Sequence, residues 1–167
     1  AMGSLPSTVK SEAWDKIQNL NVKSAFMMTQ KCAAMLQEAG TADDPSRVIN
    51  ITSVAGQTYS SMQAYAYGPS KAALNHLTKI LAAELAERHI TVNAIAPGVF
   101  PSKMTSFIMK HEAVAKQQAD QVPLKRLGEP RDMEGLAVFL ASPAAAYITG
   151  NVIALDGGTA VKPAPFI

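Results

Sequence analysis

The sequence lacks the glycine pattern that holds a dinucleotide pyrophosphate. Its ten glycines stand mostly alone. No G-x-x-x-G-x-G or G-x-G-x-x-G motif is present to offer backbone N–H groups to a phosphate at a helix N-terminus. There is also no apolar run close to the ~18 residues of a membrane span, and no signal peptide is visible. The sequence therefore predicts neither a phosphate cradle nor a membrane span.

Charge, cysteine and histidine are also scarce. Charged residues make up 17 % of the chain, and the formal net charge of +2 is too small and scattered to indicate a nucleic-acid partner. The single cysteine, Cys32, cannot form an internal disulfide; its place in a helical apolar pattern favours a buried, inert thiol. His76, His89 and His111 lack metal-ligand spacing, so no metal site is expected.

The remaining residues follow an alternation of helix and strand patterns over 167 residues, about one domain in length. Apolar spacing predicts helices over 11–36, 64–88, 104–121 and 130–141. Short β-branched or apolar runs predict buried strands over 48–51, 91–96 and 151–155. The alternation predicts an α/β fold with a doubly wound parallel, Rossmann-like sheet of about three strands. Three strands alone would expose an apolar sheet edge, so the rest of a domain or another chain is expected to cover it.

The segment from Tyr67 to Lys71, Tyr-Gly-Pro-Ser-Lys, lies near the start of the second long predicted helix. Residues four apart share one helix face, so the phenol and the ammonium can point into the same cleft. A fixed cation favours the phenolate, and a tyrosine so placed can give or take a proton near neutral pH. The pattern Tyr-x-x-x-Lys is common by chance, so the neighbouring segments must show whether it marks an active site.

Six segments resemble, in the same order, those of the short-chain dehydrogenase/reductase family. They are LNVKS (20–24), RVINITSVAG (47–56), YGPSKAAL (67–74), ITVNAIAPG (90–98), LGEP (127–130) and YITGNVIALDGG (147–158). Within the family, YAYGPSK (65–71) and PGVFPSKMT (97–105) look closest to 3-oxoacyl reductases of the rhamnolipid-associated type. The chain is thus identified as a member of this family by resemblance.

The resemblance implies an NAD(P)-dependent oxidoreductase, with NADP(H) favoured over NAD(H), acting on a small carbonyl or alcohol substrate such as a 3-oxoacyl-type ketone. Tyr67 would exchange a proton with the carbonyl oxygen, and Ser53 would polarise that oxygen. Lys71 would favour the phenolate and hold the nicotinamide ribose. Asn21 would hold a water that connects Lys71 to solvent.

The resemblance also implies a cofactor wall and a substrate lid. Pro97, Gly98, Phe100 and Ser102 would line the nicotinamide side, with the Phe100 backbone and the Ser102 hydroxyl near the carboxamide. The segment Met104 to Gln121 stands in the position of the family's substrate lid. Its apolar face could receive substrate or could simply pack in the core.

Other hydroxyl groups near Ser53 are alternatives for the residue that would polarise the carbonyl oxygen. Ser53 stands one residue farther from Tyr67 than is usual in the family, a spacing that close relatives share. Thr52 is adjacent but should point to the opposite face of a strand. Ser60 and Ser61 lie in a predicted loop that would hold them less rigidly. Ser53 is therefore the preferred residue.

Three further side chains have structural interpretations beside the functional ones. Tyr65 is expected to pack or to form a pocket wall. Lys103, where many relatives carry an acid, is interpreted as a solvated cation rather than a contact for an anionic substrate. Asn93 is expected to bond backbone across its strand.

The absent phosphate motif sets the expected extent of the chain. Residues 1–167 are expected to form the C-terminal part of a single Rossmann-like domain, with the N-terminal phosphate-binding half absent from this chain. The family implies a cytoplasmic homo-oligomer, a tetramer or a dimer, without nucleic acid or membrane partners. The alternative is a catalytically inactive fragment that acts only as an oligomerisation module.

Overall fold

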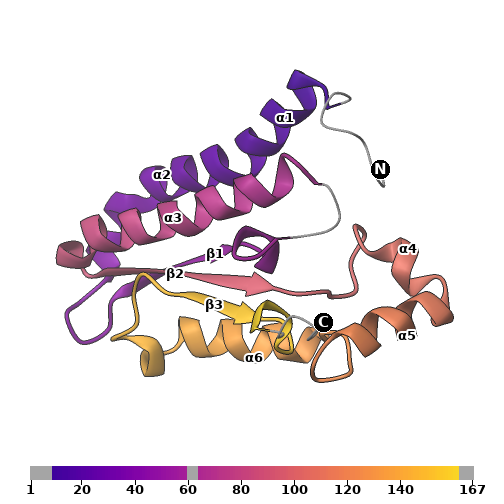
Figure 1. Cartoon of the computed structure of the whole chain (residues 1–167). Helices are drawn as coiled ribbons and strands as arrows, with labels where there is room; N and C mark the ends of the chain where they lie inside the picture. Colours follow the sequence, from indigo (N-terminus) through magenta and orange to yellow (C-terminus); the bar gives the residue numbers. More distant parts are fainter. Residues whose placement is uncertain (1–8, 60–63, 162–167) are drawn as a thin grey trace.

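The structure, a computed structural model, describes residues 9–59 and 64–161 (Figure 1). Its helices are α1 (Ser11–Gln18), a π-helical segment (Asn19–Lys23), α2 (Ser24–Ala39), α3 (Tyr67–Leu85), α4 (Ser106–Met109), α5 (Glu112–Gln121) and α6 (Pro130–Ala141). Its strands are β1 (Ser46–Ile51), β2 (Ile90–Pro97) and β3 (Val152–Leu155). All the pairings are parallel and the strand order is β1-β2-β3, so the predicted α/β fold is confirmed.

The sheet is the middle of three layers (Figure 1). Helices α1, α2 and α3 cover one face, and α6 covers the other. Alternate side chains of β2 point to opposite faces: Ile90 and Val92 pack with Leu85 of α3, whereas Ile95 packs with Leu140 of α6. The central strand is therefore buried on both sides, as its apolar sequence predicts.

Strand β1 departs from the prediction of a strand buried on both faces. It pairs with β2 from Ser46↔Ile90 to Ile51↔Ile95. Most of its residues are only half-buried, however, and Ile51 is 50 % exposed. The reason is its edge position, since no strand in the described part of the chain pairs with its outer side. The expected covering partner stays a prediction.

Two predicted helices are less regular than expected. The helix over 11–36 extends to Ala39 and contains a π-helical turn at Asn19–Lys23. The helix over 104–121 is divided into α4 and α5, with a break at Lys110–His111. Within residues 9–59 and 64–161, no helix combines the length and the apolar character that crossing a bilayer requires.

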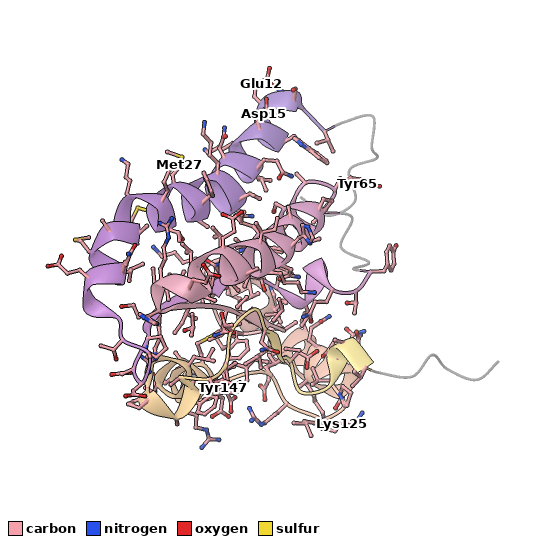
Figure 2. All side chains as sticks on the ribbon, turned by 90° about the vertical axis from the view of Figure 1, so that its left-hand side faces the viewer. Glu12, Asp15, Met27, Tyr65, Lys125 and Tyr147 are labelled. Atoms are coloured by element: carbon pink, nitrogen blue, oxygen red, sulfur yellow. The ribbon has the colours of Figure 1, made fainter. Side chains whose placement is uncertain are left out.

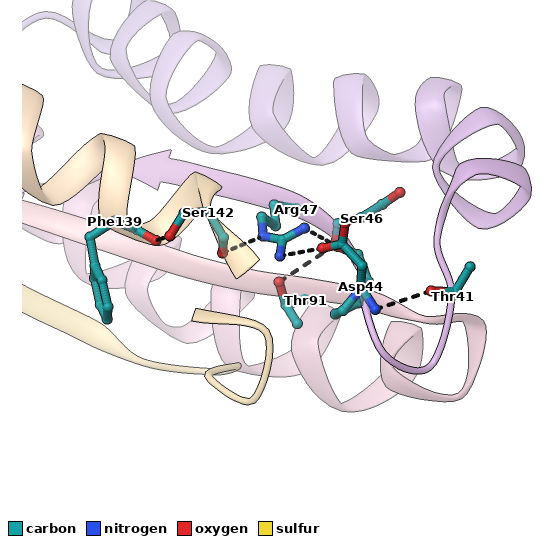
Figure 3. A network of polar contacts seen from close by, with 8 residues as sticks. Thr41, Asp44, Ser46, Arg47, Thr91, Phe139 and Ser142 are labelled. Carbon is teal, nitrogen blue, oxygen red and sulfur yellow. Dashed lines mark hydrogen bonds and ion pairs between the residues drawn. The ribbon is translucent and has the colours of Figure 1, made fainter. Parts of the chain in front are cut away.

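A polar network ties the start of β1 to the end of α6 (Figure 3). The Arg47 guanidinium donates from Nε to the Ser142 carbonyl over 3.2 Å, and it pairs with Asp44 at 2.6 Å and with the Pro45 carbonyl. The Arg47 side chain is only 13 % exposed. This clasp fixes the C-terminal end of α6 against the beginning of the sheet, which leaves the N-terminal end of α6 at the carboxyl ends of the strands.

Candidate active site

A pocket of about 440 Å³ opens at the carboxyl ends of β1 and β2, where an open α/β sheet normally binds its ligands. All the predicted site residues except Asn21 line it: Ser53, Tyr67, Lys71, Pro97, Gly98, Phe100 and Ser102. These residues come from the end of β1, the first turn of α3 and the segment after β2. The fold thus gathers in one pocket residues that are up to 49 positions apart in the sequence.

Tyr67 and Lys71 form the first turn of α3 and share one helix face. The Lys71 Nζ lies 5.6 Å from the centre of the Tyr67 ring, within the range of a cation–π contact. This is the predicted juxtaposition of a phenol and a fixed cation. The ammonium therefore places a positive charge close to the phenol ring.

Lys71 makes a second contact that fixes its ammonium. Its Nζ donates a hydrogen bond of 2.9 Å to the backbone carbonyl of Ile51, the last residue of β1. Burial lowers the pKa of the Lys71 ammonium, because desolvation disfavours the charged form. The side chain is thus held between the edge strand and the tyrosine ring.

Ser53 follows β1 and precedes a short 3-10 turn, Val54–Gly56. Its Oγ accepts a hydrogen bond of 3.2 Å from the Ala55 backbone N–H, and the residue is buried. A hydroxyl that accepts one bond can still donate its own proton. Thr52 differs, because its Oγ1 already donates to the Ile95 carbonyl at 3.1 Å. This supports Ser53 over Thr52, whereas Ser60 and Ser61 lie outside the described residues.

Gly56 explains how Ser53 comes near α3, and the sequence interpretation overlooked it. A Cβ on Gly56 would lie only 2.6 Å from the backbone of Lys71 and Ala72. Only glycine allows this close approach of the 3-10 turn to the helix. An isolated glycine just after a strand was the only sequence signal for this packing.

Asn21 does not line the pocket, but a chain of hydrogen bonds connects it to Tyr67. Its Nδ2 donates to Ser70 Oγ at 2.9 Å, and Ser70 Oγ donates to the Tyr67 carbonyl at 2.7 Å. Ser70 is completely buried. Asn21 lies in the π-helical turn, a feature frequent at functional sites. The structure thus links Asn21 to the backbone of the first turn of α3 through Ser70, a residue not predicted from the sequence.

The proposed cofactor wall is held by two close approaches. Gly98 donates its N–H to the Leu155 carbonyl at 2.9 Å, and a Cβ there would lie 2.9 Å from Asp156. The Phe100 ring lies against Gly128, where a Cβ would be 2.4 Å from the ring. These contacts fix both ends of the segment that follows β2.

Thr105 organises the polar groups that the sequence assigned to the carboxamide. Its Oγ1 donates to the Phe100 carbonyl at 2.5 Å and accepts from the Ser102 N–H at 2.8 Å. The hydroxyls of Ser102 and Thr105 also lie 3.0 Å apart. Thr105 was not predicted, because its partners are set by the fold of this short loop.

Residues 104–121, called the lid segment below, contribute Met104 and Thr105 to the pocket, and Met133 of α6 completes its apolar side. Lys103 is exposed, in agreement with a solvated cation. Near the start of α6, the Arg126 guanidinium and the Glu129 N–H hold the pKa of the Asp132 carboxyl well below its usual range. Asp132 thereby caps the helix whose first residue, Pro130, borders the pocket.

Asn93 and Tyr65 lie as predicted, whereas Cys32 does not. Asn93 donates to the Ile148 carbonyl at 2.7 Å and accepts from the Asn151 N–H at 3.1 Å, across its strand. Tyr65, labelled in Figure 2, lines a separate pocket with Gly56. Cys32 is half-buried rather than buried, because α2 is covered on only one side. Over the described ranges, no group of three histidine, cysteine or acidic residues is arranged to hold a metal.

Comparison with known proteins places these features in context. A family model described as enoyl-(acyl carrier protein) reductase matches residues 3–160. A rhamnolipids biosynthesis 3-oxoacyl-[acyl-carrier-protein] reductase of Pseudomonas aeruginosa is 49 % identical over 145 residues, which cover 87 % of this chain and 57 % of that protein. A 2-dehydro-3-deoxy-D-gluconate 5-dehydrogenase of Dickeya dadantii is 39 % identical, with coverage of 87 % and 56 %.

Solved structures agree with this relationship. The chain superposes on the Pseudomonas aeruginosa RhlG/NADP active-site complex with a TM-score of 0.90 and 45 % identity. That match covers 96 % of this chain and 62 % of the other chain. The chain therefore spans less than two thirds of the length of each of these relatives.

Proposed function

The chain belongs to the short-chain dehydrogenase/reductase family, and from this premise we propose that it carries the catalytic groups of an NADP(H)-dependent oxidoreductase. The proposed reaction interconverts a ketone, of 3-oxoacyl type, and its alcohol. The observation that carries the proposal is the pocket in which Ser53, Tyr67 and Lys71 meet. The name of the 49 % identical relative supports the substrate class, and the NADP complex supports the cofactor.

The pocket fits the nicotinamide half of such a cofactor. Pro97, Gly98, Phe100 and Ser102 form one wall of the pocket, and the packing of Gly98 against Asp156 holds that wall in place. Lys71 has further ammonium protons beyond the one given to Ile51, and these suit ribose hydroxyls. The bound cofactor would supply or accept the hydride. A site for its pyrophosphate is not found in the sequence.

The chain's own residues would handle the proton and the developing charge. In the reductive direction Tyr67 would give a proton to the carbonyl oxygen, and a bound NADPH would supply the hydride to the carbonyl carbon, so that the ketone and NADPH would become the alcohol and NADP⁺. Ser53 would donate a hydrogen bond to the same oxygen. Donors that are already in place commonly make the largest single contribution to lowering the activation barrier. Lys71 places positive charge beside the phenolate that remains. Asn21 supports this turn through Ser70 and would hold the water that returns the proton.

A second candidate function is an assembly module without catalysis. Large apolar side chains are exposed on the outer layer formed by α1, the π-helical turn and α2: Trp14, Leu20, Phe26, Met27, Met28 and Met35. Figure 2 shows Met27 on the outer face of this layer. We propose that this face associates with further copies, as a dimer or tetramer, in either functional case.

Cofactor binding discriminates between the two candidates. Titration of the purified chain with NADPH and NADH, followed by nucleotide fluorescence, is expected to give micromolar binding of the reduced nucleotide. Addition of a short 3-oxoacyl thioester should then consume NADPH. No binding of either nucleotide, with the chain correctly folded by circular dichroism, would refute the oxidoreductase proposal for this chain and leave the assembly module.

A further inference from the structure

The turn Asp156–Gly158, which follows β3, touches two segments: the Pro97–Gly98 corner, which lines the active-site pocket, and the chain directly after α5, at the end of the lid segment. On one side, the backbone of Gly98 is so close that a Cβ there would lie 2.9 Å from Asp156. On the other side, the Gly157 carbonyl accepts a hydrogen bond of 3.1 Å from the Leu124 N–H, just beyond the lid segment. The turn therefore bridges the Pro97–Gly98 corner and the end of the lid.

Both glycines of the turn are required by this contact. Gly157 has φ +62°, and a Cβ there would lie 2.6 Å from Val122 Cγ1. Gly158 has φ +91°, and a Cβ there would lie 3.2 Å from Pro123. Left-handed backbone is costly for residues with a Cβ. Val122, which caps the end of α5, is itself buried, so the turn and the lid end form one packed unit.

A further set of contacts leads from the lid end to the pocket. The chain beyond Leu124 reaches Gly128, which donates its N–H to the Val99 carbonyl at 3.0 Å and lies beneath the Phe100 ring. Phe100 lines the same pocket as Tyr67. A second cavity of about 100 Å³ lies between Phe100, Leu124 and Gly157. This space leaves room for the lid end to move if the turn does not hold it.

We propose that the Asp156–Gly158 turn is a positioning element, which fixes the end of the lid segment relative to the Pro97–Gly98 corner and so sets where the lid segment lies beside the pocket. Gly157 and Val122 are the positioning residues, and neither lines the pocket itself. The consequence for turnover rests on the proposed oxidoreductase function. The contact between the turn and the lid segment can be tested whether or not the chain has that function.

Hydrogen exchange tests the link without any need for activity. We compare the wild-type chain with Gly157→Ala, Val122→Ala and the double variant. In Gly157→Ala, the amides of residues 106–121 should exchange about 5- to 30-fold faster, because left-handed strain and the clash with Val122 loosen the lid end. The amides of β2 should exchange as in the wild type. In the Val122→Ala background the same glycine substitution should have a smaller effect, since Cγ1 is absent.

Gly135→Ala is the matched control, because a Cβ at Gly135 meets no atom within 4 Å. It should leave lid exchange unchanged. If Gly157→Ala does not fold, Val122→Ala alone must still raise exchange in the lid but not in β2. An equal rise in the lid and in β2, an unchanged lid, or strictly additive effects of the two substitutions would overturn the proposal.

Kinetics separate this inference from the proposed function. If the chain consumes NADPH, Gly157→Ala should raise the KM for the ketone by a larger factor than it lowers kcat. A chain without turnover contradicts the proposed function, while the exchange pattern still decides whether the turn positions the lid.

Discussion

Lys71 carries its charge in a position where burial disfavours it. Because its pKa is lowered in the folded state, the unfolded chain binds more protons between that lowered value and the unfolded value of about 10.4. The free energy of unfolding should therefore rise with pH across this interval. Urea unfolding of the wild type and of Lys71→Met at about pH 8 and about pH 10 should show the wild type gaining stability relative to the variant.

A constant difference between the two proteins over this interval, or a loss at the higher pH, would contradict the burial of a charged Lys71. The comparison with Lys71→Met removes the contributions of all other titrating groups. The same site therefore offers a stability measurement that is independent of catalysis.

Sequence patterns predict some site residues and cannot predict others, for a physical reason. Tyr67 and Lys71 are found from helical spacing, whereas Ser53 is found from the resemblance of its segment, RVINITSVAG (47–56), to a strand of the family. Ser70 and Thr105 matter through partners that only the folded chain brings close. Their hydroxyls look like ordinary surface groups in the sequence, and no periodicity marks them.

At the scale of elements, the strands and α6 were predicted within two residues. Apolar runs mark β2, and Pro130 marks the first turn of α6. The π-helical turn at Asn19–Lys23 and the break between α4 and α5 were not predicted, because no glycine or proline marks either position. An exposed sheet edge was predicted for three strands alone, but β1 itself was expected to be buried on both faces, since its sequence is that of a central strand.

The Arg47 clasp is the element-scale contact with the clearest expected cost (Figure 3). Arg47→Met should lower the free energy of unfolding by about 1–3 kcal/mol, because it leaves the Ser142 and Pro45 carbonyls without their charged donor. The control is Arg131→Met, whose ion pair with Glu129 is exposed at both ends and should change stability by less than about 0.5 kcal/mol. Urea unfolding measures the free energy of unfolding of both variants. Equal decreases would show that the Arg47 contacts stabilise the fold no more than an exposed ion pair does.

At the scale of the whole molecule, the outer face of the layer formed by α1 and α2 exposes large apolar side chains, of which Met28 is 61 % and Met35 64 % exposed. Met28→Glu should weaken self-association at least about tenfold, because burying an unpaired charge costs more than about 1.4 kcal/mol. Met104→Glu is the control, because Met104 is similarly exposed but lies on the lid segment; this substitution should leave self-association unchanged. Sedimentation equilibrium measures the association constant of the wild type and of both variants. A wild type that stays monomeric would contradict the proposal that the face of α1 and α2 associates with further copies.

The most direct test of the proposed catalysis is the rate of NADPH oxidation with a 3-oxoacyl thioester, for the wild type, Tyr67→Phe and Tyr65→Phe. Loss of the Tyr67 proton donor should lower turnover by about 10²- to 10⁴-fold while NADPH still binds. Tyr65→Phe should keep most of the rate, since Tyr65 lines a different pocket. Turnover by Tyr67→Phe at the wild-type rate would contradict the assignment of this pocket as the catalytic site.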